Sequence, residues 1–417
     1  MICTHKIALD PNAEQERYFR RSAGIARFAW NWALAEWIRQ RDAGEKPSEA
    51  RLRKQLNSIK RDQFPWMYDV SKCVVQEAII NLGAAFEAFF TKKSRYPRFK
   101  SRDNRRSFCA ASEAGKFRAV GKAIKLPKIG VVRMREAVRF SGTLKRVVVC
   151  EEGGRWFASI LIEADSIQKP ERPNESCVGI DLGVRKLAVV STGEIITGPN
   201  AHKSSLVKLR RASKSVSRKK KGSANRAKAR ARVAKIHRRI VNQRQDAIHK
   251  FTTRMVVAHS TICIENLNVR GMITNQRQAR AVSDQGFYEI RRQLEYKAQW
   301  YGSRIVLADR RFPSSKTCSC CGVIAMTLGR SQIVFRCDSC GATLDRDLNA
   351  ARNLEKLAAS SAVTACGEGR SDARRRPRVK RLSMKQEEVP RAAFDAVPLS
   401  SERLADHRPL NRGEAND

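Results

Sequence analysis

The stretch "CDSCGATLDRDLNAARN" (Cys337–Asn353) places two kinds of metal ligand side by side. The Cys-x-x-Cys pair of Cys337 and Cys340 is followed closely by the acids Asp345 and Asp347, which precede a helical run. Thiolates are soft ligands that suit zinc, whereas carboxylates suit hard cations such as magnesium. This stretch therefore predicts a zinc module that leads directly into a helix with acids at its start.

A second cysteine pair completes the zinc set. Cys318 and Cys321 precede the first pair at the spacing Cys-x2-Cys … Cys-x2-Cys, which is typical of structural zinc sites. Four thiolates close a tetrahedral shell and leave no open position, so the zinc is expected to be structural. Cys320 could replace a neighbour as ligand, but the spacing favours Cys318 and Cys321.

The acids allow two interpretations. Asp181 interrupts the apolar run "VGIDLGV" and Glu265 ends the apolar run "TICIE". Each acid alone could have a local role, as a strand-end turn for Asp181 or a helix cap for Asp345 or Asp347. Together they could instead meet at a sheet edge and hold magnesium. Two such ions about 4 Å apart activate water and stabilise the leaving oxygen in phosphodiester hydrolysis.

The charge balance indicates a polyanionic partner. The chain has 417 residues and a formal net charge of +42, with a sequence pI of about 10.6. Nucleic acid is the commonest partner of so basic a protein. We find no apolar run of about 18 residues and no signal peptide, which predicts no membrane association and a place inside the cell. The cysteines are then expected to be reduced or metal-bound.

Two basic segments are candidate nucleic-acid contacts. Residues 201–259 predict two helical arms split at Gly222 and Ser223, and Lys92–Phe108 interleaves aromatic with basic residues. A solvated basic face and a solvated connector are the respective alternatives. The residues expected to contact nucleic acid are Lys92, Lys93, Arg98, Lys100, Arg218, Lys219, Lys220, Lys221, Arg226 and Arg230.

An ordered set of motifs resembles the TnpB family of transposon-encoded RNA-guided DNA endonucleases, relatives of the type V CRISPR effectors. The motifs are "GIDLGVRKLAVVSTGE", "ICIENLNV" and "DRDLNAARN", with the four-cysteine finger between the last two. "ARFAWNWAL", "YPRFKSR", "SRKKKGSANRAKAR" and "FPSSKTCSCCG" are similar to further landmarks of that family. The resemblance covers roughly residues 1 to 356.

The resemblance implies an α/β multi-domain fold. It comprises a RuvC-like nuclease domain of RNase H fold with an inserted four-cysteine zinc ribbon, preceded by a helical recognition domain and a β-barrel wedge domain. Strand and helix patterns in the sequence agree with this order and give the expected boundaries. These are 1–10 and 109–170 for the wedge, 11–108 for recognition, 171–317 and 341–357 for the nuclease, 318–340 for the finger and 358–417 for a disordered basic tail.

The resemblance also implies an activity: cleavage of double-stranded DNA next to a short transposon-adjacent motif, directed by a guide RNA from the transposon end. Asp181, Glu265 and Asp347 would be the catalytic, magnesium-binding acids, with Asp345 in a supporting or capping role. A partner transposase could share the element, and the location would be cytoplasmic, at the nucleoid. The alternatives are a nuclease-inactive regulator that binds RNA or DNA, and a RuvC-type nuclease that needs no RNA.

Overall fold

The computed structural model describes residues 1–102, 106–112, 115–165, 169–173, 176–325, 328–329 and 332–367. Of the expected tail, residues 368–417 therefore lie outside the described residues, as does part of the Pro-containing linker at 166–176. The expected start of the tail at 358 is wrong, because helix α9 (Arg346–Gly367) continues through it. The alanine-rich run after Leu357 favours a helix. The sequence prediction ended the helix too early because the chain becomes polar and charged farther on.

The N-terminal strand joins strands that follow much later in the chain. One seven-stranded antiparallel sheet has the order β2-β6-β7-β1-β5-β4-β3. Its strands are β1 (Ile2–Asp10), β2 (Ser107–Ala111), β3 (Arg118–Val120), β4 (Ala123–Leu126), β5 (Gly130–Met134), β6 (Gly142–Glu152) and β7 (Arg155–Ala164). β2 begins inside the segment expected to be helical. Among the described residues, no pairing of the edge strands β2 and β3 closes this sheet into a barrel.

Helices between β1 and β2 share a core with this sheet. They are α1 (Ala13–Asp42), α2 (Glu49–Gln63), the 3-10 helix η1 (Pro65–Asp69) and α3 (Lys72–Phe90). Asn12 and Gln15 form a capping box that begins α1. Trp37 of α1 stacks on Phe86 of α3 with ring centroids 4.0 Å apart. Helices α1 and α3 match the two helical patterns in the sequence, whereas α2 was not anticipated.

Helix α3 corrects the expectation that no segment could span a membrane. Lys72–Phe90 is long and apolar enough to do so by length and composition. The core helix of a soluble protein passes the same test, and Val74, Ile79, Leu82 and Phe86 of α3 are buried in the core shared with the sheet. Packing against α1 thus accounts for the apolar character of this helix.

A second sheet carries the acids. Its order is β10-β9-β8-β11-β12, built from β8 (Cys177–Leu182), β9 (Ala188–Val190), β10 (Ile195–Ile196), β11 (Thr261–Glu265) and β12 (Arg304–Ala308). Strands β8, β11 and β12 are parallel, and β9 and β10 are antiparallel additions. The carboxyl ends of the three parallel strands therefore meet at one edge.

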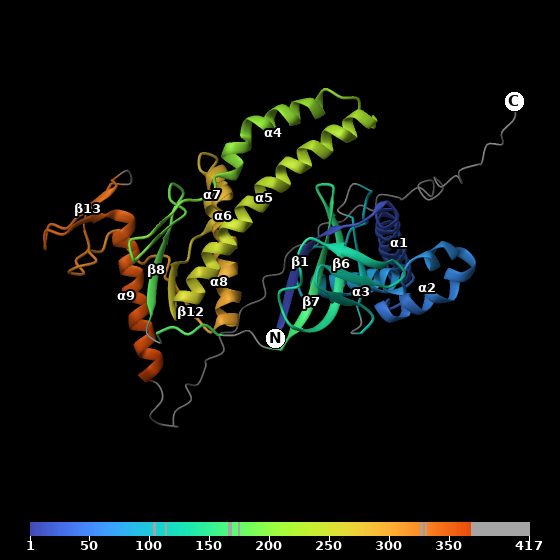
Figure 1. Cartoon of the computed structure of the whole chain (residues 1–417), viewed down its shortest axis with the longest axis horizontal. Helices are drawn as coiled ribbons and strands as arrows, with labels where there is room; N and C mark the ends of the chain where they lie inside the picture. Colours follow the sequence, from blue (N-terminus) through green and yellow to red (C-terminus); the bar gives the residue numbers. More distant parts are fainter. Residues whose placement is uncertain are drawn as a thin grey trace. The chain divides into compact units, whose positions relative to one another are not determined.

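Helices cover both faces of this sheet (Figure 1). Val178, Ile180, Ile262 and Ile264 pack with helices α5 (Ala224–Ala258) and α8 (Phe287–Tyr301) on one face. Cys263 and Ala308 pack with Leu354 and Ala358 of α9 on the other. Because side chains alternate along a strand, Asp181 and Glu265 belong to the face that α9 covers.

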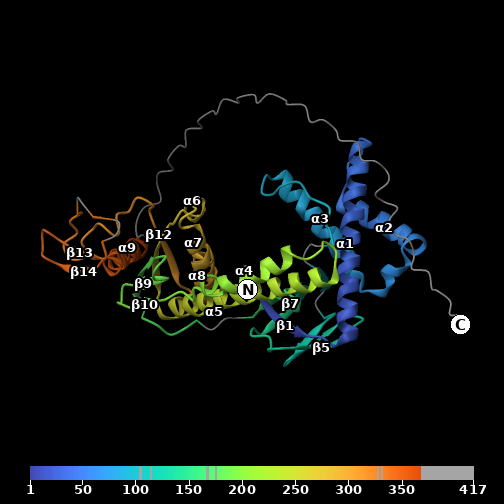
Figure 2. The same ribbon diagram turned by 90° about the horizontal axis from the view of Figure 1, so that it is seen from above.

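The most basic segment is a helical hairpin, as the sequence predicted. Helices α4 (Ala201–Ser217) and α5 run side by side and are joined by a turn at Gly222 (Figures 1 and 2). Short helices α6 (Val269–Thr274) and α7 (Ala279–Gln285) then lead into α8. Strands β13 (Val334–Arg336) and β14 (Thr343–Asp345) pair with each other, so the ribbon extends past its expected end at 340 to Asp345.

Candidate metal centres and nucleic-acid surface

Asp181, Glu265 and Asp347 gather at the carboxyl edge of the second sheet. Asp181 precedes the last residue of β8, Glu265 ends β11, and Asp347 lies in the first turn of α9. Burial, and then the negative charges of Glu265 and Asp347, raise the pKa of Asp181 to about 8. A concentration of carboxylates that raises a pKa in this way is what a divalent cation would neutralise.

Gly179 determines how closely α9 approaches β8. A Cβ at this position would lie 2.0 Å from the Ala351 carbonyl oxygen and 2.4 Å from the Glu355 nitrogen. Any other residue would therefore push the helix backbone away. Gly179 thus brings Asp347, one turn before Ala351, to the sheet edge where Asp181 lies.

Asp345 caps α9 and contacts a lysine that sequence reasoning missed. Its Oδ1 accepts the backbone N–H groups of Asp347 and Leu348 at 3.0 and 3.2 Å. Lys186 Nζ lies 2.9 Å from Asp345 Oδ2 and 3.4 Å from Asp347 Oδ2. Burial acts to raise the pKa of Asp345, but hydrogen bonds from Lys186 and the helix N–H groups lower it overall. The Lys186 ammonium thus supplies positive charge among the acids.

Ser314 orients Glu265. Its hydroxyl donates to Glu265 Oε1 at 2.6 Å, and Ser314 itself is buried. The serine lies in the segment that enters the zinc ribbon, so its role was not visible in the sequence. The contact fixes one oxygen of the carboxylate and leaves the other for a ligand.

The four predicted cysteines converge. The Sγ atoms of Cys318, Cys321, Cys337 and Cys340 all lie within 4.8 Å of one another. Within the part of the chain that the structure describes, no other group of metal-ligating side chains is compact enough to hold an ion. The carboxylate oxygens of Asp181, Glu265 and Asp347 therefore do not form such a compact group in this structure. Cys320 is exposed and outside the cluster.

Both cysteine pairs form the same turn. The Gly322 and Gly341 N–H groups each donate at 2.9 Å to the carbonyl of the first cysteine of their pair. Both glycines have positive φ, at +81° and +71°, a conformation that other residues rarely adopt. Four thiolates held by two such knuckles fit a tetrahedral zinc ion.

Two asparagines fasten the first knuckle to α9. Asn349 Oδ1 accepts the Ser319 N–H at 2.8 Å, and Asn349 Nδ2 donates to the Thr317 carbonyl at 2.7 Å. One turn later, Asn353 Nδ2 donates to the Ser314 carbonyl at 2.8 Å and to the Thr317 carbonyl at 2.6 Å. Both asparagines are buried. Helix α9 thereby holds the ribbon and the serine that orients Glu265.

The basic loop after α3 is held against α1. Trp30 Nε1 donates to the Arg98 carbonyl at 3.0 Å, and the Asn31 side chain bonds both backbone groups of Lys100. Lys100 Nζ lies 3.7 Å from the centre of the Trp30 ring, and burial lowers its pKa. The side chains of Lys92, Lys93 and Arg98 remain exposed.

The turn of the α4–α5 hairpin combines exposed and anchored cations. Arg218, Lys220 and Lys221 are exposed and Lys219 is half-buried. Arg226 donates from Nη1 to the Lys219 carbonyl at 3.0 Å and so fixes the turn itself. Arg230, one turn further along α5, is exposed. Most of the predicted contacts thus present their charge to solvent, while Lys100 and Arg226 also have structural roles.

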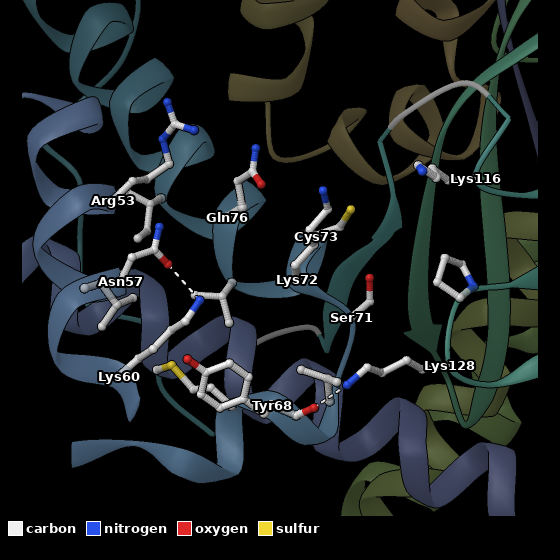
Figure 3. Close-up of a pocket in the computed structure, with 16 residues that line it drawn as sticks. Arg53, Asn57, Lys60, Tyr68, Ser71, Lys72, Cys73, Gln76, Lys116 and Lys128 are labelled. Atoms are coloured by element: carbon white, nitrogen blue, oxygen red, sulfur yellow. Dashed lines mark hydrogen bonds between the residues drawn. The ribbon is translucent and has the colours of Figure 1, made fainter. Parts of the chain in front are cut away.

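A cavity of about 600 Å³ lies between α2, η1, α3 and the β4–β5 turn (Figure 3). Its rim is cationic, with Arg53, Lys60, Lys72, Lys116 and Lys128, and no acid lines it. Asn57 and Gln76 add amide groups that can hydrogen-bond base edges. This lining suits an anionic ligand. No local sequence pattern indicates the cavity, because its residues come from separate elements.

Three models of known protein families match parts of this chain. Models described as "Probable transposase", "Cas12f1-like, TNB domain" and "Helix-turn-helix domain" match residues 159–276, 287–354 and 1–46. A "Putative RNA-guided DNA endonuclease" of Streptomyces pristinaespiralis is 39% identical over 93% of this chain and 96% of its own length. The chain belongs to the TnpB family. InsQ of Escherichia coli, named in the same words, is 35% identical over 87% of this chain and 93% of its own.

The helix-turn-helix match and the solved structures add little to the description of this TnpB-family chain. The residues matched by the helix-turn-helix model form strand β1 and the single long helix α1. Among solved structures, a Cas12f1–sgRNA–target DNA complex aligns over 85% of this chain at 15% identity with a TM-score of 0.33. CasPhi-2 (Cas12j) bound to crRNA aligns over 86% at 11% identity with a TM-score of 0.40. At these scores neither alignment carries an argument.

Proposed function

We propose that this chain is an RNA-guided, magnesium-dependent DNA endonuclease of an insertion-sequence transposon, which cuts DNA next to a short transposon-adjacent motif. The observation that carries the proposal is the gathering of Asp181, Glu265 and Asp347 at one sheet edge, where burial, and then the negative charges of Glu265 and Asp347, raise the pKa of Asp181. The names of the TnpB-family relatives support the guided activity. Sheet order and strand directions support a RuvC-like nuclease domain of RNase H fold.

Asp181, Glu265 and Asp347 would hold the magnesium ions. Bound magnesium supplies an activated water and charge stabilisation for the leaving oxygen. Asp181 must lose its proton to act as a ligand. Ser314 keeps Glu265 in one orientation, and the ammonium of Lys186 balances Asp345 and Asp347 while no divalent cation is present.

The four cysteines would hold a structural zinc ion. With Asn349 and Asn353, the knuckles fix the segment that carries Ser314 against α9. This arrangement links the ribbon to two of the three acids. The exposed cations of the hairpin turn and of the loop after α3 would bind the phosphates of guide RNA and DNA, in a protein that acts in the cytoplasm at the nucleoid.

The test begins with the RNA. Protein purified from its native host is expected to carry a defined RNA from the transposon end, identified by sequencing. That complex should cut a plasmid that bears the matched target and the adjacent motif, only with magnesium present. A defined RNA without cleavage would favour a nuclease-inactive regulator. Cleavage by protein free of RNA would favour an unguided RuvC-type nuclease.

A further inference from the structure

Ser314 is connected to the zinc ribbon through one tight turn. The backbone N–H and the hydroxyl of Thr317 both donate to the Pro313 carbonyl at 2.9 Å. This turn encloses Ser314 and ends directly before the zinc ligand Cys318. The Ser314 hydroxyl in turn donates to Glu265 Oε1 at 2.6 Å. One short turn and one hydrogen bond therefore separate a zinc ligand from a proposed magnesium ligand.

Helix α9 holds this turn from one side. Asn353 Nδ2 donates to the carbonyls of Ser314 and Thr317 at 2.8 and 2.6 Å. Lys356 Nζ donates to the Ser319 carbonyl at 2.6 Å. Asn353 is buried, and leaving a buried amide without its hydrogen bonds costs free energy. The turn therefore has one favoured position on α9 as long as the first knuckle keeps its shape.

The hydrophobic core of the ribbon is small. Among its described residues, the buried cluster consists of Cys318, Phe335 and Cys337, against which Ala325, Leu328 and Ala342 pack. Two of the three buried side chains are themselves cysteines of the proposed zinc site. Modules with so small a core depend on their metal to fold. Loss of zinc is therefore expected to loosen the first knuckle and, with it, the turn that carries Ser314.

We propose that Ser314 is a positioning residue through which zinc in the ribbon sets the magnesium affinity of the nuclease centre. With zinc bound, the first knuckle holds the Ser314 hydroxyl against Glu265, so one orientation of the carboxylate is favoured. Hydrogen-bonding partners of metal ligands typically contribute about 10- to 100-fold to metal affinity or activity. Without zinc, ordering Glu265 consumes part of the binding free energy, so magnesium binds more weakly. The inference rests on the proposed function, because it takes Glu265 as a magnesium ligand.

The linkage has a consequence for the assembly of the active protein. Two ligands that bind one molecule change each other's affinity by the same factor, so magnesium also strengthens zinc binding. A chain that has not yet acquired zinc binds guide RNA but cuts poorly at low magnesium. The nuclease centre therefore becomes fully competent only after the ribbon is loaded.

The experiment is a double-mutant cycle on magnesium binding. Full-length protein with its guide RNA is compared with Ser314→Ala, Cys321→Ser and the variant that carries both changes. Calorimetry titrates magnesium into each complex, and the heat of the matching Glu265→Gln complex is subtracted, so that ions bound by the RNA cancel. Each single variant should bind magnesium about tenfold more weakly. The double variant should bind no more weakly than the weaker single variant, because both changes remove the same contact.

Ser319→Ala is the matched control. Ser319 is a buried serine of the same knuckle, and its hydroxyl has no hydrogen-bond partner among the residues that the structure describes. This variant should bind magnesium as the parent does, and Ser314→Thr, which keeps a hydroxyl, should bind it more tightly than Ser314→Ala. High magnesium should restore cleavage by Ser314→Ala, because the change lowers magnesium affinity and leaves the acids in place. Guide-RNA binding by every variant reports correct folding.

The outcomes separate the linkage from the nuclease function. Magnesium affinity unchanged in Ser314→Ala, or equally lowered in Ser319→Ala, would overturn the role of Ser314. A double variant weakened by the product of the two single effects, about a hundredfold, would mean that zinc acts by another route. Each of these results leaves the nuclease proposal standing. The expected cycle in a protein that never cuts matched DNA would contradict the nuclease and leave the linkage standing.

Discussion

Gly179 of β8 and Ala351 of α9 are in backbone contact: a Cβ on Gly179 would come within 2.0 Å of the Ala351 carbonyl oxygen. This contact determines where the helix that carries Asp347 crosses the strand that carries Asp181. Asp347 and the four-cysteine ribbon both depend on the placement of α9.

Gly179→Ala should displace α9. We expect the free energy of unfolding to fall by about 1–3 kcal/mol through overpacking, and cleavage to be lost while guide-RNA binding persists. Gly24→Ala is the matched control, because nothing lies within 4 Å of a Cβ at this helical position. That variant should be as stable as the parent or slightly more so. Denaturant unfolding and a cleavage assay on both variants check the prediction; an unchanged Gly179→Ala would refute the close approach.

Lys186→Met should lower the magnesium concentration that gives half-maximal binding. Lys186 Nζ lies 2.9 Å from Asp345 Oδ2 and 3.4 Å from Asp347 Oδ2. Its ammonium group therefore competes with magnesium for these two carboxylates. Titration calorimetry of magnesium into the complex measures this, with Lys203→Met, an exposed lysine on α4, as the charge control. Weaker magnesium binding in Lys186→Met would mean that the lysine supports the metal site instead of competing with the ion.

Cys321→Ser should abolish zinc binding and destabilise the ribbon, whereas Cys320→Ser should do neither. Cys321 belongs to the cluster within 4.8 Å, while Cys320 lies outside it. Elemental analysis should find about one zinc per chain in the parent and in Cys320→Ser. Loss of zinc from Cys320→Ser alone would reverse the ligand assignment.

Lys297 should make stability depend on pH. This buried lysine of α8 donates to neutral acceptors of α5, such as Thr252 Oγ1 and Thr253 Oγ1, both at 2.8 Å. Burial lowers its pKa from 10.5 to about 8. Between these two values the unfolded chain binds more protons than the folded one, so the free energy of unfolding rises with pH in that window.

Lys297→Met should remove this contribution to the slope. Denaturant unfolding between pH 8 and 10 compares the variant with its parent, and Lys250→Met provides a control at an exposed lysine of α5. If the free energy of unfolding of Lys297→Met rose with pH as steeply as that of its parent, groups other than Lys297 would cause the pH dependence.

Much of the site was predictable from local patterns. The spacing of the two Cys-x-x-Cys pairs identifies the four cysteines that the structure brings together. Asp181 and Glu265 stand out in the sequence because they interrupt or end apolar strands. Burying a carboxylate costs free energy, so an acid in such a run suggests a functional role. The capping role of Asp345 followed from its place before a helical run.

The remaining features depend on contacts between distant segments. Ser314 meets Glu265 across 49 positions of the chain, and Lys186 meets Asp345 across 159. No local pattern encodes either pairing. Helix α2 was missed because its sequence is mostly polar, although Leu52, Leu56 and Ile59 recur at helical spacing. The end of α9 was missed because its alanine-rich sequence lacks a strong apolar period.

The most direct test of the nuclease centre compares three near-isosteric variants. Asp181→Asn, Glu265→Gln and Asp347→Asn, each with bound guide RNA, are assayed with magnesium for cleavage of a plasmid that carries the matched target. We predict that each variant binds RNA as the parent does and loses cleavage by at least about a hundredfold. Cleavage at the parent's rate by any of the three would contradict the assignment of that acid to the metal centre.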